Sequence, residues 1–152
     1  MGEADLLFQL DGDADVMKYI TLGIPRTMDE VIEKSMPRIL KSYQDKTDFG
    51  IFAAYLINSE KYIGWFQFEE DKEFEHSIEI GWRLKKQYWG NGYATEVATV
   101  LCDLGIKMGK TIVARAMIEN LASIRVMEKA GLKFEKKFWY PHSCSPDESY
   151  KR

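Results

Sequence analysis

The stretch Gln87-Tyr88-Trp89-Gly90-Asn91-Gly92-Tyr93-Ala94 (residues 87–94) decides the fold of this chain, because it joins two segments of different period. Residues 77–84, before it, alternate between apolar and polar side chains, which predicts a β-strand. Residues 94–108, after it, carry apolar side chains at helical spacing. A strand, a loop with two glycines and a helix in this order place backbone N–H groups at a positively polarised helix start. The sequence therefore predicts a phosphate-binding loop.

The spacing of the glycines narrows the choice of phosphate ligand. The Walker pattern requires a Lys-Ser or Lys-Thr pair after the second glycine, and none is present. The dinucleotide pattern G-x-G-x-x-G requires a third glycine where Thr95 stands. The pattern that remains is Q-x-x-G-x-G, formed by Gln87, Gly90 and Gly92. Read alone, these glycines are also compatible with an ordinary turn between a strand and a helix.

The loop resembles the pyrophosphate loop of the GNAT superfamily of N-acetyltransferases, which bind acetyl-coenzyme A. The longer run over residues 79–96, opening with Glu-Ile-Gly-Trp, is similar to the ribosomal-protein N-acetyltransferase branch (RimJ/RimL-like). A second segment, residues 120–132, resembles the family pattern N-x-x-S-I-R-V-x-E-K-x-G-[FL]. The resemblance spans about residues 4 to 140, with the motifs in the family's order.

The pattern of elements predicts an α/β (α+β) fold in the order α-α-β-β-β-α-β-α-β. Residues 4–19 are helical in pattern, with an interruption at 11–13. Thr27 and Glu30 form a capping box that opens a second helix, and Pro37 is expected to split or kink that helix. Strands are expected over residues 49–57, 62–68, 77–84 and 111–117, with a charged connector over 69–75.

The resemblance implies the GNAT fold, a mixed central sheet flanked by helices, as a single domain over residues 1–152. Against the family pattern, the first and last strands are expected to be missing or truncated. The chain begins inside a helical pattern, and residues 141–152 are rich in Ser and Pro. Two explanations stay open: the chain is a fragment, or another subunit of a homodimer supplies strands. A missing strand would leave an unpaired sheet edge.

Composition restricts the class of protein. A hydrophobic content of 45% with 30% charged residues describes an ordinary globular chain, and a net charge of -3 argues against a nucleic-acid binder. No apolar run approaches the ~18–20 residues of a membrane span, and no signal-peptide pattern is present, so a cytoplasmic protein without a membrane partner is expected. Cys102 is expected in the core. His76 and His142 are isolated, so no metal site is predicted.

The resemblance implies that acetyl-CoA is the cosubstrate and that the glycine loop holds its pyrophosphate. Asn120 is expected to hydrogen-bond the cofactor near the pantetheine, although capping of the following helix explains an Asn equally well. Backbone N–H groups near Trp82 to Leu84 are candidates to polarise the thioester carbonyl. The predicted cofactor-binding residues are Trp82, Leu84, Gln87, Tyr88, Trp89, Gly90, Asn91, Gly92, Tyr93, Ala94, Asn120 and Ser123.

Acetyl transfer to an amine also requires a base and help for the leaving thiolate. Glu79, on the strand before the loop, is the candidate general base, acting through a water. The alternative is an exposed glutamate on the polar face of the strand. Many relatives protonate the thiolate with a tyrosine where this chain has Met127, so Ser123 is the candidate substitute; helix capping is its alternative role.

The acceptor is expected to be a primary amine, either a small molecule or a protein N-terminus. The acidic run over residues 69–75 has two interpretations: it attracts a cationic amine, or it is a solvated hairpin. Two rivals to the enzyme stay open, a non-catalytic acyl-CoA-binding module and a defective fragment. The prediction is direct transfer in a ternary complex, because neither cysteine lies in a motif for an acyl-enzyme.

Overall fold

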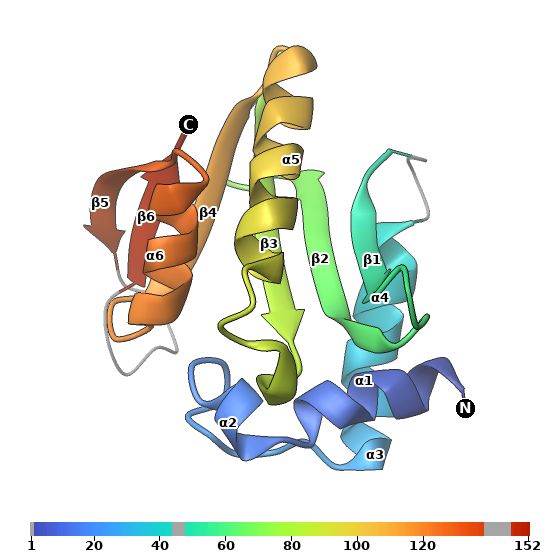
Figure 1. Cartoon of the computed structure of the whole chain (residues 1–152). Helices are drawn as coiled ribbons and strands as arrows, with labels where there is room; N and C mark the ends of the chain where they lie inside the picture. Colours follow the sequence, from blue (N-terminus) through green and yellow to red (C-terminus); the bar gives the residue numbers. More distant parts are fainter. Residues whose placement is uncertain (1, 44–47, 139–146) are drawn as a thin grey trace. The chain divides into compact units, whose positions relative to one another are not determined.

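The computed structural model describes residues 2–43, 48–138 and 147–152. In these ranges the strands form one mixed sheet in the order β1-β2-β3-β4-β6-β5 (Figure 1). The strands are β1 (Gly50–Tyr55), β2 (Tyr62–Glu70), β3 (Ser77–Leu84), β4 (Thr111–Met117), β5 (Lys133–Phe138) and β6 (Asp147–Lys151). β3 and β4 pair in parallel, whereas β6 is antiparallel to both β4 and β5. The bounds of β3 and β4 match the predicted strands.

The helices follow the predicted order. They are α1 (Glu3–Asp11), α2 (Ala14–Met17), α3 (Met28–Glu30), a π-turn η1 (Val31–Ser35), α4 (Met36–Ser42), α5 (Tyr93–Lys107) and α6 (Leu121–Lys129). The interruption between α1 and α2 and the capping box at Thr27 are confirmed. None of the helices in the described ranges is long and apolar enough to cross a membrane.

Pro37 is accompanied by a change in the spacing of the backbone hydrogen bonds in the second helix, from four residues to five. Proline has no N–H to donate to the carbonyl four residues earlier. The helix accommodates this with the π-turn, in which Met36 N–H donates to the carbonyl of Val31, and Pro37 then lies in the first turn of α4. The predicted split is therefore a local widening of the helix, and it turns Ser35 into the interior.

The chain forms two compact units, which are described separately. The first unit comprises Met1–Gln67 and Trp82–Asn91, and the second comprises Phe68–Gly81 and Gly92–Arg152. The core of the first unit contains residues from α1, α2, η1, β1 and β2. These core residues are Leu7, Leu10, Val16, Val31, Ile51, Tyr62 and Trp65.

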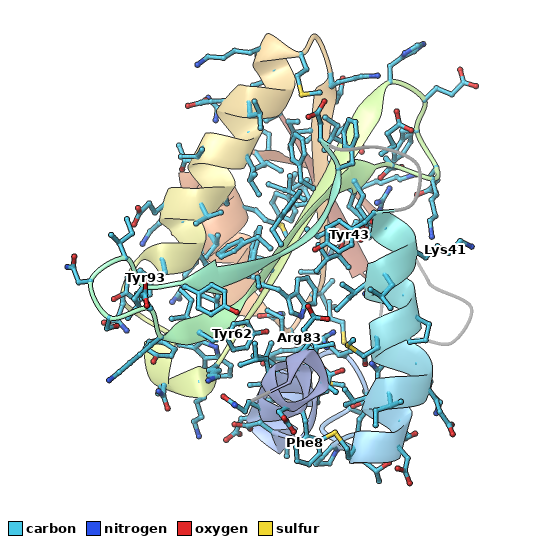
Figure 2. All side chains as sticks on the ribbon, turned by 90° about the vertical axis from the view of Figure 1, so that its right-hand side faces the viewer. Phe8, Lys41, Tyr43, Tyr62, Arg83 and Tyr93 are labelled. Atoms are coloured by element: carbon cyan, nitrogen blue, oxygen red, sulfur yellow. The ribbon has the colours of Figure 1, made fainter. Side chains whose placement is uncertain are left out.

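A buried charge cluster, here called the Asp11 cluster, joins distant parts of the first unit. The Asp11 carboxylate, only 1% exposed, accepts hydrogen bonds from Arg26 Nη1 at 3.0 Å, from Ser35 Oγ at 2.6 Å and from Arg83 Nη1. Arg83 is labelled in Figure 2. Its guanidinium also lies 5.0 Å from the Trp65 ring. Burial lowers the pKa of Arg83, and the Asp11 charge opposes that shift. The cluster fixes α1 and η1 to the end of β3.

In the second unit, α5 packs on one face of β3 and β4. A Cβ on Gly105 would overlap the side chain of Ile112, and Ile78 is the next neighbour. Ile78, Ile112 and Cys102 are fully buried, which confirms the predicted core position of Cys102. Cys144 and His142 lie outside the described residues.

The closing strand corrects the sequence prediction. Asp147–Lys151 forms β6, although this end of the chain was expected to lack or truncate its strand. β6 has a neighbour on each side, and the Tyr150 ring packs 5.8 Å from Phe134. Pairing with two strands supplies hydrogen bonds that a weak local β-propensity does not predict.

Candidate functional site

The glycine loop leads directly into the first turn of α5. Gly90 and Gly92 have φ angles of 75° and 84°, a left-handed conformation that favours glycine. A Cβ built on either glycine would meet no atom within 4 Å. Gly92 is the N-cap and has no side chain to cap the first turn, which closes with Glu96 N–H donating to the Gly92 carbonyl at 2.9 Å. The start of α5 thus combines open space with the positive end of a helix dipole.

Internal hydrogen bonds hold the loop in shape. The Trp89 indole Nε1 donates to the Leu84 carbonyl at 2.8 Å, and Asn91 Nδ2 donates to the Trp89 carbonyl at 3.0 Å. Trp89 is nevertheless 47% exposed. Lys86, which precedes Gln87, forms an ion pair with Asp15 at 2.5 Å.

The predicted cofactor residues differ in their exposure. Leu84 is buried, while Trp82, Tyr88, Tyr93, Ala94 and Ser123 are half-buried, and Gln87, Gly90, Asn91 and Gly92 are exposed. The loop therefore presents its backbone and polar side chains to solvent.

Asn120 and Ser123 meet at the start of α6. The Asn120 side-chain oxygen accepts a hydrogen bond from the Ser123 backbone N–H at 3.2 Å, so Asn120 caps this helix as one of its two predicted roles requires. Met127 lies about two turns after the start of α6, and it is only 2% exposed. A buried thioether neither donates nor accepts a proton, so this position supplies no general acid.

Glu79 lies where the parallel ladder of β3 and β4 ends. The ladder pairs Ser77 with Thr111, Ile78 with Ile112 and Glu79 with Val113. Glu79 points to the face of the strands opposite the buried Ile78 and keeps 30% of its side chain exposed. Its carboxylate is therefore partly reachable from solvent, which a general base needs.

A second charge cluster, here called the Arg115 cluster, surrounds Glu79. Arg115 Nη1 lies 3.1 Å from Glu79 Oε1 and 2.6 Å from Asp71 Oδ2, while Nη2 lies 3.0 Å from Glu73 Oε2. The Arg115 side chain is only 7% exposed, and its guanidinium lies 5.7 Å from the Phe74 ring. One buried cation thus contacts three carboxylates.

The protonation states in the Arg115 cluster follow from these contacts. Burial of Arg115 disfavours its charged form, but the hydrogen bond to Asp71 and the Glu79 charge outweigh it and raise the pKa of the guanidinium. Burial acts to raise the pKa of Asp71, yet the Arg115 hydrogen bond and the N–H groups of Phe74 and Glu73 lower it overall. The pair is ionised throughout the physiological range.

Two features of this site were missed or left open by the sequence. β2 extends to Glu70, so the charged connector begins later than predicted, and Asp71 is buried against Arg115. The acidic run is therefore not simply a solvated hairpin. The sequence places Arg115 in a strand that is otherwise largely apolar, and it gives no partner for the charge. A single arginine in the middle of a buried strand indicates that its charge is paired in the fold.

Comparisons with known proteins identify the class. The profile of the family described as "Acetyltransferase (GNAT) domain" matches residues 2–133. The uncharacterized N-acetyltransferase YnaD of Bacillus subtilis is 32% identical over 132 residues, covering 85% of this chain and 72% of that protein.

Two solved structures share the fold. The crystal structure of an acetyltransferase (GNAT family) from Bacillus anthracis aligns with a TM-score of 0.79 at 28% identity, covering 99% of this chain and 88% of that one. The spermidine N-acetyltransferase from Vibrio cholerae, in complex with CoA and spermine, aligns with a TM-score of 0.73 at 16% identity, covering 100% and 91%. The chain belongs to the GNAT family of acetyltransferases.

Proposed function

We propose that this acetyltransferase binds acetyl-CoA at the glycine loop and the start of α5 and transfers the acetyl group to a primary amine. The observation that carries the proposal is the uncapped first turn of α5, preceded by two left-handed glycines with open space beside them. Backbone N–H groups in such a turn bind a pyrophosphate, because the helix dipole and the donors act together.

The chemistry assigns one role to each predicted catalytic residue. Acetyl-CoA supplies the acetyl group as a thioester. Glu79 accepts one proton of the bound ammonium through a water, which frees the nitrogen lone pair to attack the carbonyl carbon. As the C–N bond forms and the C–S bond breaks, the second proton of the nitrogen goes to the departing thiolate. Backbone N–H groups near Trp82 to Leu84 stabilise the oxyanion. The Ser123 hydroxyl donates a hydrogen bond to the departing thiolate, and Asn120 contacts the cofactor while capping α6.

The acceptor is proposed to be a cationic primary amine. The spermidine N-acetyltransferase with the same fold was solved with CoA and spermine, which supports a small-molecule amine. Three carboxylates face two cations in this cluster, Arg115 and Lys136, so the surroundings of Glu79 keep an excess negative charge, which favours an ammonium group. The motifs also support the RimJ/RimL-like branch, and with it a protein N-terminus as the alternative acceptor, a cytoplasmic location and a homodimer.

Cofactor binding is tested by calorimetric titration with acetyl-CoA and with free CoA. Gly90→Ala should weaken binding by about tenfold or more, because a left-handed alanine costs roughly 1–2 kcal/mol and places a methyl group in the open space. Gly109→Ala is the matched control: Gly109 has φ 72° and the same open surroundings, but it follows the far end of α5. Saturable binding weakened only by Gly90→Ala supports the loop; equal affinities would overturn it.

Turnover is tested by CoA release with spermine, kanamycin and a short peptide bearing a free N-terminus. Glu79→Gln should lower kcat/KM by roughly 10²-fold or more while acetyl-CoA still binds, because an amide accepts no proton. Glu135→Gln is the matched control, since Glu135 also lies on a strand, is 31% exposed and pairs with a cation, Lys151. Unchanged turnover in Glu79→Gln would remove Glu79 as the base. CoA binding without turnover on any amine would favour the binding module over the enzyme.

A further inference from the structure

Arg115 has no role in the chemistry above, although it contacts the proposed base. We propose that Arg115 is a positioning residue: it holds the Glu79 carboxylate in place at the end of the β3–β4 ladder. The inference rests on the proposed function of Glu79 as the general base.

The positioning begins at a rigid anchor, Asp71. The Asp71 backbone N–H donates to the Ser77 carbonyl at 2.9 Å. Its carboxylate Oδ1 accepts from the backbone N–H groups of Glu73 and Phe74, each at 2.8 Å. The side chain is fully buried. Because the turn fixes this carboxylate through its own backbone, Asp71 can orient a partner without moving.

Arg115 links the Glu79 carboxylate to the fixed Asp71 carboxylate. The same nitrogen, Nη1, contacts Asp71 Oδ2 at 2.6 Å and Glu79 Oε1 at 3.1 Å. Arg115 is two residues beyond Val113, which pairs with Glu79, so both side chains lie on the same face of adjacent strands. A guanidinium is planar and holds several donors in a fixed fork, whereas an ammonium is a point charge on a flexible stem. The contact therefore depends on arginine specifically.

The charge balance explains why the cation is needed. Glu79, Asp71 and Glu73 lie around Arg115. Lys136 is 3.9 Å from Glu73 and 4.8 Å from the Phe74 ring, and Lys151 lies over that ring at 3.9 Å. Arg115 is the cation that contacts both Asp71 and Glu79, and without it these two carboxylates would repel each other and Glu79 would lose its fixed position.

The experiment compares Arg115→Lys and Arg115→Met with the wild type and with Glu135→Gln. The Glu135 variant removes a partly exposed partner of Lys151 and should keep kcat/KM within about twofold, as an exposed ion pair contributes little. Arg115→Met should lower kcat by about 10²-fold, in line with the cost of a misplaced catalytic group, and leave the KM for acetyl-CoA unchanged. Arg115→Lys should keep the charge and lose part of kcat.

Carbon NMR separates positioning from folding and needs no acceptor. The signal of the Glu79 carboxyl carbon, assigned with Glu79→Gln, should move at neutral pH in Arg115→Met, which lacks the contact to Nη1, and should move less in Arg115→Lys, which keeps the charge. Circular dichroism and thermal melts establish that each variant is folded.

The outcomes distinguish a failure of Glu79 as the base from a failure of Arg115 as its positioning residue. If Glu79→Gln turns over like the wild type, the proposed base fails and Arg115 has no base to position. If Glu79→Gln is inactive but both Arg115 variants keep the wild-type kcat and the wild-type signal of the Glu79 carboxyl carbon, only the positioning role fails. If Arg115→Met does not fold, Arg115→Lys decides: wild-type kcat in that variant overturns the need for the guanidinium fork.

Discussion

The Asp11 cluster and the Arg115 cluster have central charges of opposite sign, and their outer charges differ in exposure to solvent. In the first unit, one buried carboxylate is shared by two guanidiniums and a hydroxyl. In the second unit, one buried guanidinium is shared by three carboxylates, of which Glu79 is 30% and Glu73 54% exposed. The Asp11 carboxylate is closed off from solvent, and its most exposed partner is Arg26 at 26%, whereas two carboxylates of the Arg115 cluster reach solvent.

Under the proposed function, this difference separates a cluster that serves structure alone from one that also serves chemistry. A closed buried ion cluster cannot exchange a proton with a substrate, but it fixes the elements that carry it. A cluster with a partly exposed carboxylate can do both. The Nε atoms of Arg83 and Arg115 are buried without a hydrogen-bond partner among the described residues, so the terminal nitrogens of these two arginines make the contacts.

The largest effect on stability is expected at the centre of the closed cluster. Asp11→Ala leaves two guanidiniums facing a buried site without their counter-ion, so the free energy of unfolding should fall by about 3–5 kcal/mol. Urea unfolding followed by circular dichroism measures this value. A loss below about 1 kcal/mol would mean that water enters and solvates the arginines, and that the cluster is open like its counterpart.

A smaller effect is expected for Asp71→Asn, because Arg115 keeps Glu73 and Glu79. The free energy of unfolding at neutral pH should fall by about 1–3 kcal/mol. The pKa of Asp71 is lower in the folded chain than its unfolded value of about 3.9, so its ionised form stabilises the fold above that pH. This contribution is lost as the pH falls through the lower folded-state pKa.

The acid unfolding curves of the two proteins test that sign. Wild-type stability should decrease below about pH 4, and the difference between wild type and Asp71→Asn should shrink over the same range. A difference that stays constant from pH 7 to pH 2 would show that Asp71 acts through its shape alone.

The smallest effect is expected for an ion pair outside both clusters. Asp15 and Lys86 lie 2.5 Å apart, but both side chains are more than half exposed. Solvent and salt screen such a pair, so Asp15→Asn should be indistinguishable from the wild type in urea unfolding. A measurable loss would show that exposure alone does not separate the stabilising charges from the others.

Much of the fold was predictable because it depends on local pattern. The bounds of β3 and β4 follow from side-chain alternation and β-branched content, and the start of α5 follows from the paired glycines. The capping box at Thr27 was readable from two residues three positions apart. The strand β6 was not predictable, because its stability comes from neighbours on both sides.

The candidate site divides in the same way. The sequence by itself determined the glycine loop, the N-cap Asn120 and the placement of Glu79 on a strand, because each depends on residues a few positions apart. Only the tertiary structure decided that Arg83 reaches Asp11 across 72 positions and that Arg115 reaches Asp71 across 44. Buried charges are paired wherever the fold brings opposite charges together, and a period-2 or period-3.6 pattern contains no information about which strands become neighbours.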